Sequence, residues 1–169
     1  MTAPITPSDI TLRPIMPSDN AALARVIRST LEEFGANHPG TVYYDESTDR
    51  LSEVFERPGS CYLVALHNGK VVGGGGIYPT EGLPEGTAEL VKMYLRREVR
   101  GIGLGSRIIQ SVLDWAGDAG YKQIYLESMP ELRKALSTYE RFGFKYLDAP
   151  MGNSGHFGCG LWMLKTLEV

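Results

Sequence analysis

The order of the predicted elements indicates an α/β (α+β) fold, in which helices cover both faces of a mixed sheet. Two observations predict this fold. Segments with strand-like alternation first follow one another as an antiparallel meander, and the middle of the chain then has the pattern of a β–α–β unit. A further helix and two strands come after it. At 169 residues, the chain is expected to form one domain, residues 1–169, whose core needs neither disulfides nor metal.

The first half of the chain alternates between helical and extended patterns. Leu23, Ile27 and Leu31 fall on one face of a helix that Ser18 can cap. The pair Asn68–Gly69, between two strand-like runs, is the strongest short signal for a hairpin. In order, we expect a strand at 10–15, a helix at 18–34, a loop or broken helix at 35–47, a short helix at 49–55, and strands at 61–66, 71–78 and 87–95.

The second half continues with longer helices. Apolar residues from Leu104 to Ala116 recur with helical spacing, and Gly120 stands where a helix-ending glycine is expected. Gly143 ends a second helix in the same way. The four consecutive glycines at 73–76 predict a β-bulge in their strand. After the first of these helices, we expect a strand at 122–128, a helix at 130–142 and strands at 144–147 and 160–167.

Composition excludes several classes of function. The net charge of −3 and the pI of about 5.6 leave no basic surface for nucleic acid. No run approaches the roughly 18 apolar residues of a membrane span, and the N-terminal segment lacks the pattern of a secretion signal. A cytoplasmic protein without membrane or nucleic-acid partners is therefore expected. In that compartment Cys61 and Cys159 are predicted to be two reduced, buried thiols.

A glycine motif, VRGIGLG at 99–105, precedes the longest predicted helix of the second half. Glycines in this position let backbone N–H groups close around a phosphate. A Walker loop is excluded because no Lys–Ser or Lys–Thr follows the glycines. A Rossmann fingerprint fits poorly, since the spacing is G-x-G-x-G and the motif lies after a meander.

A third interpretation accounts for more of the chain. The arrangement Arg100-x-x-Gly103-x-Gly105, entered from the strand ELVKMYL, is followed at 135–144 by ALSTYERFGF. Both segments, in this order and spacing, resemble the acetyl-CoA motif and the A-x-x-x-Y-E-x-x-G-F segment of the GNAT superfamily of N-acyltransferases. The resemblance covers roughly residues 10–167. It implies the GNAT fold, with a central mixed sheet of about six to seven strands.

The resemblance also implies an activity. Enzymes of this superfamily move an acyl group, most often acetyl, from CoA to a primary amine of a small molecule or peptide, by direct attack in a ternary complex. Acetyl-CoA is thus the expected cosubstrate and an amine the expected acceptor, and a homodimer formed through the C-terminal strand is compatible with the family. A sensor or regulatory module that binds acyl-CoA without turnover is the alternative on the same fold.

The cofactor would bind along one strand and the glycine motif. Backbone N–H groups at the positive end of a helix would hold the pyrophosphate, where glycine allows close approach or positive φ. The pantetheine arm would add to a strand edge opened where Ala88–Leu95 and Gln123–Glu127 splay apart, and the Met93 N–H would polarise the thioester carbonyl. Arg100 would add a cation or a structural contact. The candidate cofactor-binding residues are Met93, Tyr94, Leu95, Arg100, Gly101, Ile102, Gly103, Leu104, Gly105 and Ser106.

Two side chains are the candidate catalytic residues. Tyr139 matches the family's tyrosine that protonates the leaving CoA thiolate. Glu89 matches a glutamate that several members use as the base, and a water chain is the alternative, because an alkyl amine with a pKa near 10 must lose a proton before it attacks.

The acceptor pocket is expected between 33–46 and 149–159. Glu33, Tyr43 and Tyr44 are the candidate acceptor-binding residues, since charge and aromatic faces suit a cationic amine. Asp45 and Glu46 could assist them. No metal is expected, because neither His38 nor His156 has metal-ligand spacing to a cysteine or carboxylate.

Overall fold

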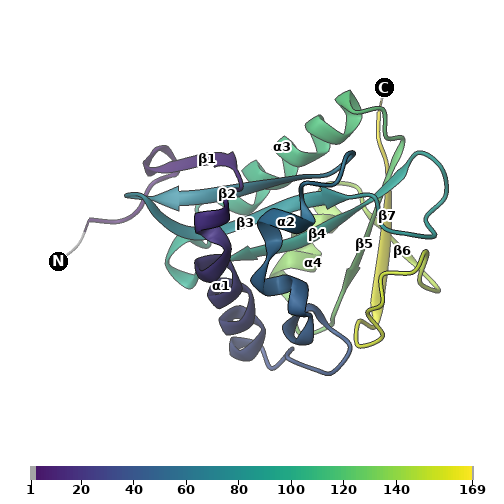
Figure 1. Ribbon diagram of the computed structural model, residues 1–169, viewed down its shortest axis with the longest axis horizontal. Coiled ribbons are helices and arrows are strands. Elements are labelled where there is room, and N and C mark those ends of the chain that lie inside the picture. The colour runs from purple at the N-terminus through teal and green to yellow at the C-terminus, as the bar shows by residue number, and fades with distance from the viewer. Residues whose placement is uncertain (1–2, 169) are drawn as a thin grey trace.

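The computed structural model describes residues 3–168, whose strands form a seven-stranded mixed sheet of order β1-β2-β3-β4-β5-β7-β6 (Figure 1). Every neighbouring pair is antiparallel except β4–β5, which is parallel. This agrees with the predicted α/β class and number of strands. The strands are β1 (Ile10–Pro14), β2 (Cys61–His67), β3 (Lys70–Tyr78), β4 (Thr87–Leu95), β5 (Gln123–Ser128), β6 (Lys145–Leu147) and β7 (Leu161–Thr166).

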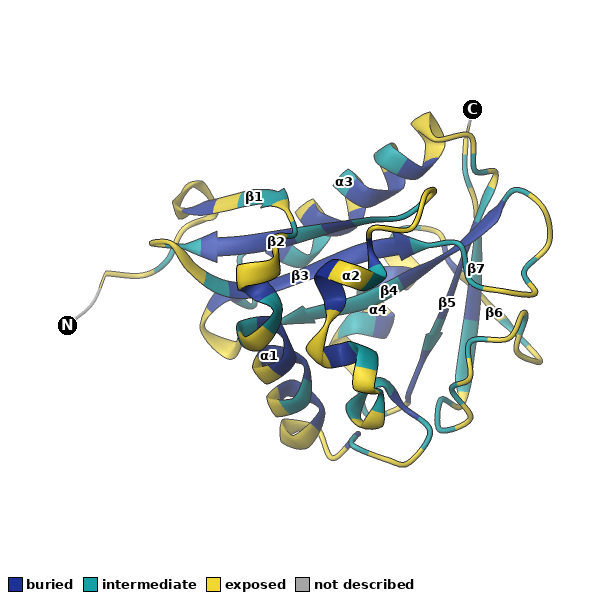
Figure 2. Cartoon of the chain, viewed as in Figure 1, coloured by how far each residue is buried: buried dark blue, intermediate teal, exposed yellow. Residues whose placement is uncertain are grey.

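Helices cover both faces of this sheet (Figures 1 and 2). They are α1 (Asn20–Glu33), α2 (Leu51–Val54), α3 (Leu104–Asp118) and α4 (Arg133–Arg141), and two 3₁₀ turns, η3 (Val42–Tyr44) and η4 (Glu46–Asp49), lie between α1 and α2. One core cluster joins the apolar face of α1 to α2 and strand residues such as Val64. A second joins α3 and α4 to the other face, around Ile77 and Ile124. The 3.6-residue periodicity in the sequence identified these buried stripes correctly.

Two predicted helix starts are wrong. Ser18 does not cap α1, because residues 17–19 form a separate 3₁₀ turn and α1 begins at Asn20. That turn is held by Asp19, which accepts the Met16 N–H at 2.8 Å and pairs with Arg13 at 2.7 Å. The helix expected from residue 130 begins only at Arg133, since Leu132 donates its N–H to Met129 in a preceding turn.

The parallel pair β4–β5 separates soon after it begins (Figure 1). Its register covers only three pairs, from Thr87–Gln123 to Glu89–Tyr125. Beyond Glu89, within the described residues, β4 continues to Leu95 without pairing to β5. The expected splay of these two strands is therefore present, and it opens a backbone edge between the two layers of helices.

A bulge in β4 lies opposite the glycine run of β3. The β3–β4 register shifts between Gly74 and Gly76, so that Lys92 and Met93 of β4 stand opposite a single residue. Lys92 has φ 55°, which is uncommon for a residue with a side chain. Its carbonyl accepts the Tyr62 hydroxyl at 2.8 Å. The bulge thus lies in β4, opposite the glycines and not within their run as predicted, and it brings Lys92 and Met93 to the opening between the strands.

Candidate active site

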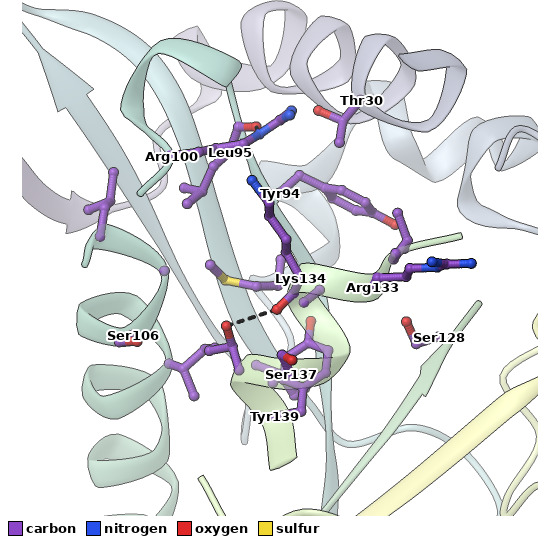
Figure 3. A pocket seen from close by; sticks show the side chains of 18 of the residues that line it. Thr30, Tyr94, Leu95, Arg100, Ser106, Ser128, Arg133, Lys134, Ser137 and Tyr139 are labelled. Carbon is purple, nitrogen blue, oxygen red and sulfur yellow. Dashed lines mark hydrogen bonds between the residues drawn. The ribbon is translucent and has the colours of Figure 1, made fainter. Parts of the chain in front are cut away.

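A cavity of about 680 Å³ lies where β4 and β5 separate, bounded by the C-terminal end of α1, the N-terminus of α3 and α4. Figure 3 shows Arg100 and Leu95 at one end and Tyr139 of α4 at the other. Nine of the ten candidate cofactor-binding residues line this cavity. The exception is Ile102, which packs against a core cluster with Val99 and Leu104.

The glycine motif forms an open turn at the N-terminus of α3. Gly101 and Gly103 have φ 79° and 83°, and a Cβ at either position would meet nothing within 4 Å. Positive φ is the reason for glycine here. Gly105 is different, because it is already helical and a Cβ would stand 3.5 Å from Leu95 Cδ1, an ordinary contact. Positive φ therefore does not require glycine at 105, and close approach of a phosphate stays the predicted reason for it.

The N-terminus of α3 has no side-chain cap. The first bond of the helix is donated by the Arg107 N–H to the Gly103 carbonyl at 3.0 Å, so the N–H groups of the first turn have no partner within the helix. These N–H groups lie at the N-terminus of a helix of 15 residues, which is the positive end of its dipole. The arrangement can hold the negative charge of a phosphate without any side-chain cation.

The side chain of Arg100 is already engaged in three contacts. Its Nε donates to the Leu95 carbonyl at 3.0 Å, its Nη1 pairs with Glu33 at 2.5 Å, and its guanidinium lies 5.1 Å from the centre of the Phe34 ring. These contacts tie the end of β4 to the end of α1 across the cavity mouth. Arg100 therefore braces the glycine turn, and its charge is partly neutralised by Glu33.

Tyr139 lies on the cavity wall formed by α4. It is 7% exposed, and its ring makes an edge contact with Phe144 at 5.9 Å between centroids. Within residues 3–168 its hydroxyl has no hydrogen-bond partner. Burial raises the pKa of Tyr139 above its usual range, so the phenol keeps its proton at neutral pH. The ring is thus held in place while the hydroxyl remains available to a ligand.

Glu89 is buried at the point where β4 and β5 part. It is 4% exposed and accepts a hydrogen bond from the Thr80 hydroxyl at 2.6 Å. Burial, with the charge of Glu127 in addition, raises the pKa of Glu89 to about 7, although the Thr80 hydrogen bond opposes this. Glu89 does not itself line the cavity, whereas Glu127 and Lys92 do. A carboxylate with this pKa can take up a proton near neutral pH.

The structure separates the three candidate acceptor-binding residues. Glu33 lies beside Arg100 at the glycine turn, with Arg97 also 3.8 Å away. Tyr43 donates a hydrogen bond to Glu32 on the outer side of α1, and Tyr44 is exposed next to it. None of the three lines the cavity.

Asp45, which the sequence analysis named as a residue that could assist acceptor binding, belongs to a charged cluster with His156 and Glu127 that the sequence did not identify. His156, from the loop before β7, places Nε2 2.6 Å from Asp45 Oδ2 and Nδ1 3.8 Å from Glu127 Oε1. Glu127 also accepts hydrogen bonds from the hydroxyls of Ser154 at 2.5 Å and Tyr125 at 2.7 Å. The cluster ties the loop before β7 to the loop after α1 and to the end of β5.

The charges in this cluster hold one another in their ionised forms. Burial opposes the charged form of His156, but its two carboxylate neighbours outweigh burial and raise the pKa of His156 to about 9. Burial also opposes ionisation of Asp45 and Glu127, yet His156 and the hydrogen bonds to these carboxylates lower both pKa values. At neutral pH, the imidazolium therefore lies between two carboxylates.

The described residues form neither a metal site nor a membrane-spanning helix. No three His, Cys, Asp or Glu side chains among residues 3–168 gather in a way that could hold a metal ion. No helix in this part of the chain has the length and apolar character to cross a membrane. Both cysteines are free thiols and half-buried.

Comparison with known proteins adds independent evidence. The model of the Acetyltransferase (GNAT) family matches residues 23–144. The chain is 37% identical to the Escherichia coli protein named uncharacterized N-acetyltransferase YjgM, over 96% of this chain and 98% of that protein. It is 25% identical to a Schizosaccharomyces pombe protein named uncharacterized N-acetyltransferase C1271.07c, over 82% of this chain and 85% of that one.

Solved structures show the same fold. A GNAT-family acetyltransferase from Staphylococcus aureus superposes with a TM-score of 0.84 at 18% identity, covering 94% of this chain and 99% of that chain. The PaiA N-acetyltransferase of Thermoplasma acidophilum, solved in complex with coenzyme A, gives 0.72 at 19% identity, with 94% and 99% covered. The family model matches most of the chain, and the Escherichia coli relative is similar along nearly all of it. The chain therefore belongs to the GNAT family and is an N-acetyltransferase.

Proposed function

We propose that the protein transfers an acetyl group from acetyl-CoA to a primary amine by direct attack within a ternary complex. One observation carries the proposal. A single cavity joins the uncapped N-terminus of α3 to the opened edge of β4 and to the unpartnered hydroxyl of Tyr139. The complex of PaiA with coenzyme A supports the use of an acyl-CoA by this fold.

The cofactor would lie along this cavity. The N–H groups from Gly101 to Ser106 would hold the pyrophosphate, and the unpaired edge of β4 would hold the two amides of the pantetheine arm. The thioester would then reach the bulge. There the Met93 N–H would donate to the carbonyl oxygen, and this bond strengthens as negative charge develops on that oxygen.

The chemical step needs two proton transfers. The amine nitrogen attacks the thioester carbon, a tetrahedral intermediate forms, and the C–S bond breaks to give an amide and the CoA thiolate. Tyr139 would give its proton to the thiolate. Glu89 would take the proton released by the amine through a bridging water, since its carboxylate lies behind the cavity wall.

The test measures release of the CoA thiol from acetyl-CoA with a panel of primary amines between pH 5.5 and 9. We expect transfer to at least one acceptor, with kcat/KM rising through about pH 7 as Glu89 loses its proton. Glu89→Gln should remove this rise and lower the rate at pH 8 at least tenfold, whereas acetyl-CoA affinity should hold. Thr80→Val, which removes a hydrogen bond to the carboxylate, should move the rise to higher pH.

Two results would contradict the proposal. Tight binding of acetyl-CoA without thiol release for any amine would point to the sensor function. An unchanged pH profile for Glu89→Gln would show that the amine itself or a water chain determines the rise.

A further inference from the structure

Lys92 is a buried cation that the proposed mechanism does not use. Its side chain is 9% exposed and lines the cavity. It is part of the β4 bulge, and the hydrogen bond from the Tyr62 hydroxyl to its carbonyl fixes the backbone there. Lys92 adjoins Met93, whose N–H is proposed to receive the thioester oxygen. The ammonium is therefore held near the point where acetyl transfer would take place.

This ammonium has no hydrogen-bond partner among the described residues. Its nearest charged neighbour is Asp45 Oδ2 at 3.8 Å, and that oxygen already binds His156 Nε2 at 2.6 Å. Burial lowers the pKa of Lys92, and the negative charges of Asp45 and Glu89 offset only part of this decrease. A buried ammonium without hydrogen bonds is unfavourable, so its three donors are available to an anionic group that enters the cavity.

The charge balance around Lys92 indicates what kind of acceptor fits. Lys92 shares its nearest carboxylate, Asp45, with His156, which lies closer to that carboxylate at 2.6 Å. A plain alkylammonium would add a third positive charge beside Lys92 and His156. A molecule with one ammonium and one carboxylate adds no net charge, and its carboxylate would supply the acceptors that the Lys92 donors lack.

We propose that Lys92 binds the carboxylate of the acceptor, and that the acceptor is an amino acid, with the amine and the carboxylate in one molecule. This inference rests on the proposed acetyl transfer and specifies its substrate class. With the carboxylate on Lys92, the amine of the same molecule lies only a few bonds away, close to the thioester carbon at Met93. Lys92 is then the residue that determines acceptor specificity.

The experiment compares matched acceptors that differ only in the carboxylate. Each of several amino acids is paired with its carboxamide and its decarboxylated amine, and kcat/KM is measured from CoA thiol release. The wild-type protein should prefer the amino acids at least tenfold. Lys92→Met should lower kcat/KM for the amino acids at least tenfold, change it less than threefold for the partners that lack the carboxylate, and leave acetyl-CoA affinity unchanged.

Two further variants control for charge and folding. Lys92→Arg keeps the cation and should keep most of the preference. Lys70→Met removes a lysine at the exposed β2–β3 turn and should behave as wild type. Should Lys92→Met fail to fold, Lys92→Gln gives the same comparison.

Equal use of amino acids and of their partners without a carboxylate by the wild-type protein would overturn the inference and leave acetyl transfer intact. An equal loss for all acceptors in Lys92→Met would also overturn it, because Lys92 would then act in the chemical step. Absence of thiol release with every acceptor would instead contradict the proposed function.

Discussion

The two ends of the cavity are built in different ways. At the glycine end, the functional groups are backbone N–H donors of one short segment, Gly101 to Ser106, fixed by positive φ and by a helix. At the other end, they are charged side chains of Asp45, Lys92, Glu127 and His156, which come from four separate parts of the fold. The first end suits a group that all acyl-CoA molecules share. The second can vary between relatives without any change in the backbone, and so can specify the acceptor.

The largest effect is expected at Tyr139, which lines the cavity between the two ends and is the proposed proton donor to the leaving thiolate. Tyr139→Phe keeps the ring and its contact with Phe144 but removes the hydroxyl. A positioned proton donor is worth roughly 10²–10⁴-fold in rate. We expect kcat and kcat/KM to fall together by about 100-fold in steady-state assays, with unchanged melting temperature and acetyl-CoA affinity. An unchanged kcat would show that Tyr139 only packs and that another group protonates the thiolate.

The next effect concerns the stability of the end with the charged side chains, which we call the acceptor end because the acceptor is proposed to bind there. The pKa of His156 is raised from 6.5 to about 9 in the folded protein, so its contribution to stability is fully present below pH 6.5 and is lost as the pH rises through 9. At about 1.4 kcal/mol per pH unit, and allowing for the exposed part of the ring, the wild-type protein should lose about 2 kcal/mol of unfolding free energy over this interval.

Denaturant unfolding at several pH values measures this loss. His156→Gln should be less stable at pH 6.5 and should lack this decrease between pH 6.5 and 9. His38→Gln is the control, because the exposed His38 pairs with Glu131 outside the cluster, and it should keep the wild-type pH dependence. If the unfolding free energies of wild type and His156→Gln change with pH in the same way, the cluster does not stabilise the acceptor end.

The third effect tests the glycine end through the two termini of one helix. Gly103 and Gly120 flank α3, both have positive φ, and a Cβ at either would meet nothing within 4 Å. Alanine at either position should therefore destabilise the fold to a similar degree, by about 1 kcal/mol. Only Gly103→Ala should also weaken acetyl-CoA binding, at least tenfold by calorimetry, which corresponds to about 1.4 kcal/mol. Equal affinities for both variants would refute the phosphate site.

The difference between the two ends of the cavity also explains how much of the structure the sequence could predict. Each helix and strand of the second half was predicted within a few residues, because periodicity and helix-ending glycines are local signals. The glycine end was predicted for the same reason. The one feature that the spacing did not reveal is that Gly105 already lies within the helix and lacks the positive φ of Gly101 and Gly103.

The acceptor end could not be predicted in this way. The bond between His156 and Asp45 joins residues 111 positions apart, and no spacing rule connects them. Lys92 appeared as a polar residue in an apolar strand, and its approach to the cavity depends on a bulge that only the β3–β4 register reveals. Glu33 was assigned to the acceptor because it lies in the segment 33–46 and its charge suits a cationic amine. The helix directs it instead toward Arg100, 67 positions away.

The smallest effect concerns Glu33. Its carboxylate is paired with Arg100, which the Leu95 carbonyl and the Phe34 ring also hold in place. Glu33→Gln should therefore leave Arg100 in position with more of its charge available to the cofactor phosphates. Because exposed ion pairs are worth about 0.2–1 kcal/mol, acetyl-CoA should bind about two- to threefold more tightly at low ionic strength, and KM for the acceptor should not change. Glu32→Gln, on the neighbouring residue that binds Tyr43, is the matched control and should alter neither value. A rise in acceptor KM confined to Glu33→Gln would return Glu33 to the acceptor site, and the two ends of the cavity would then be less distinct than their construction indicates.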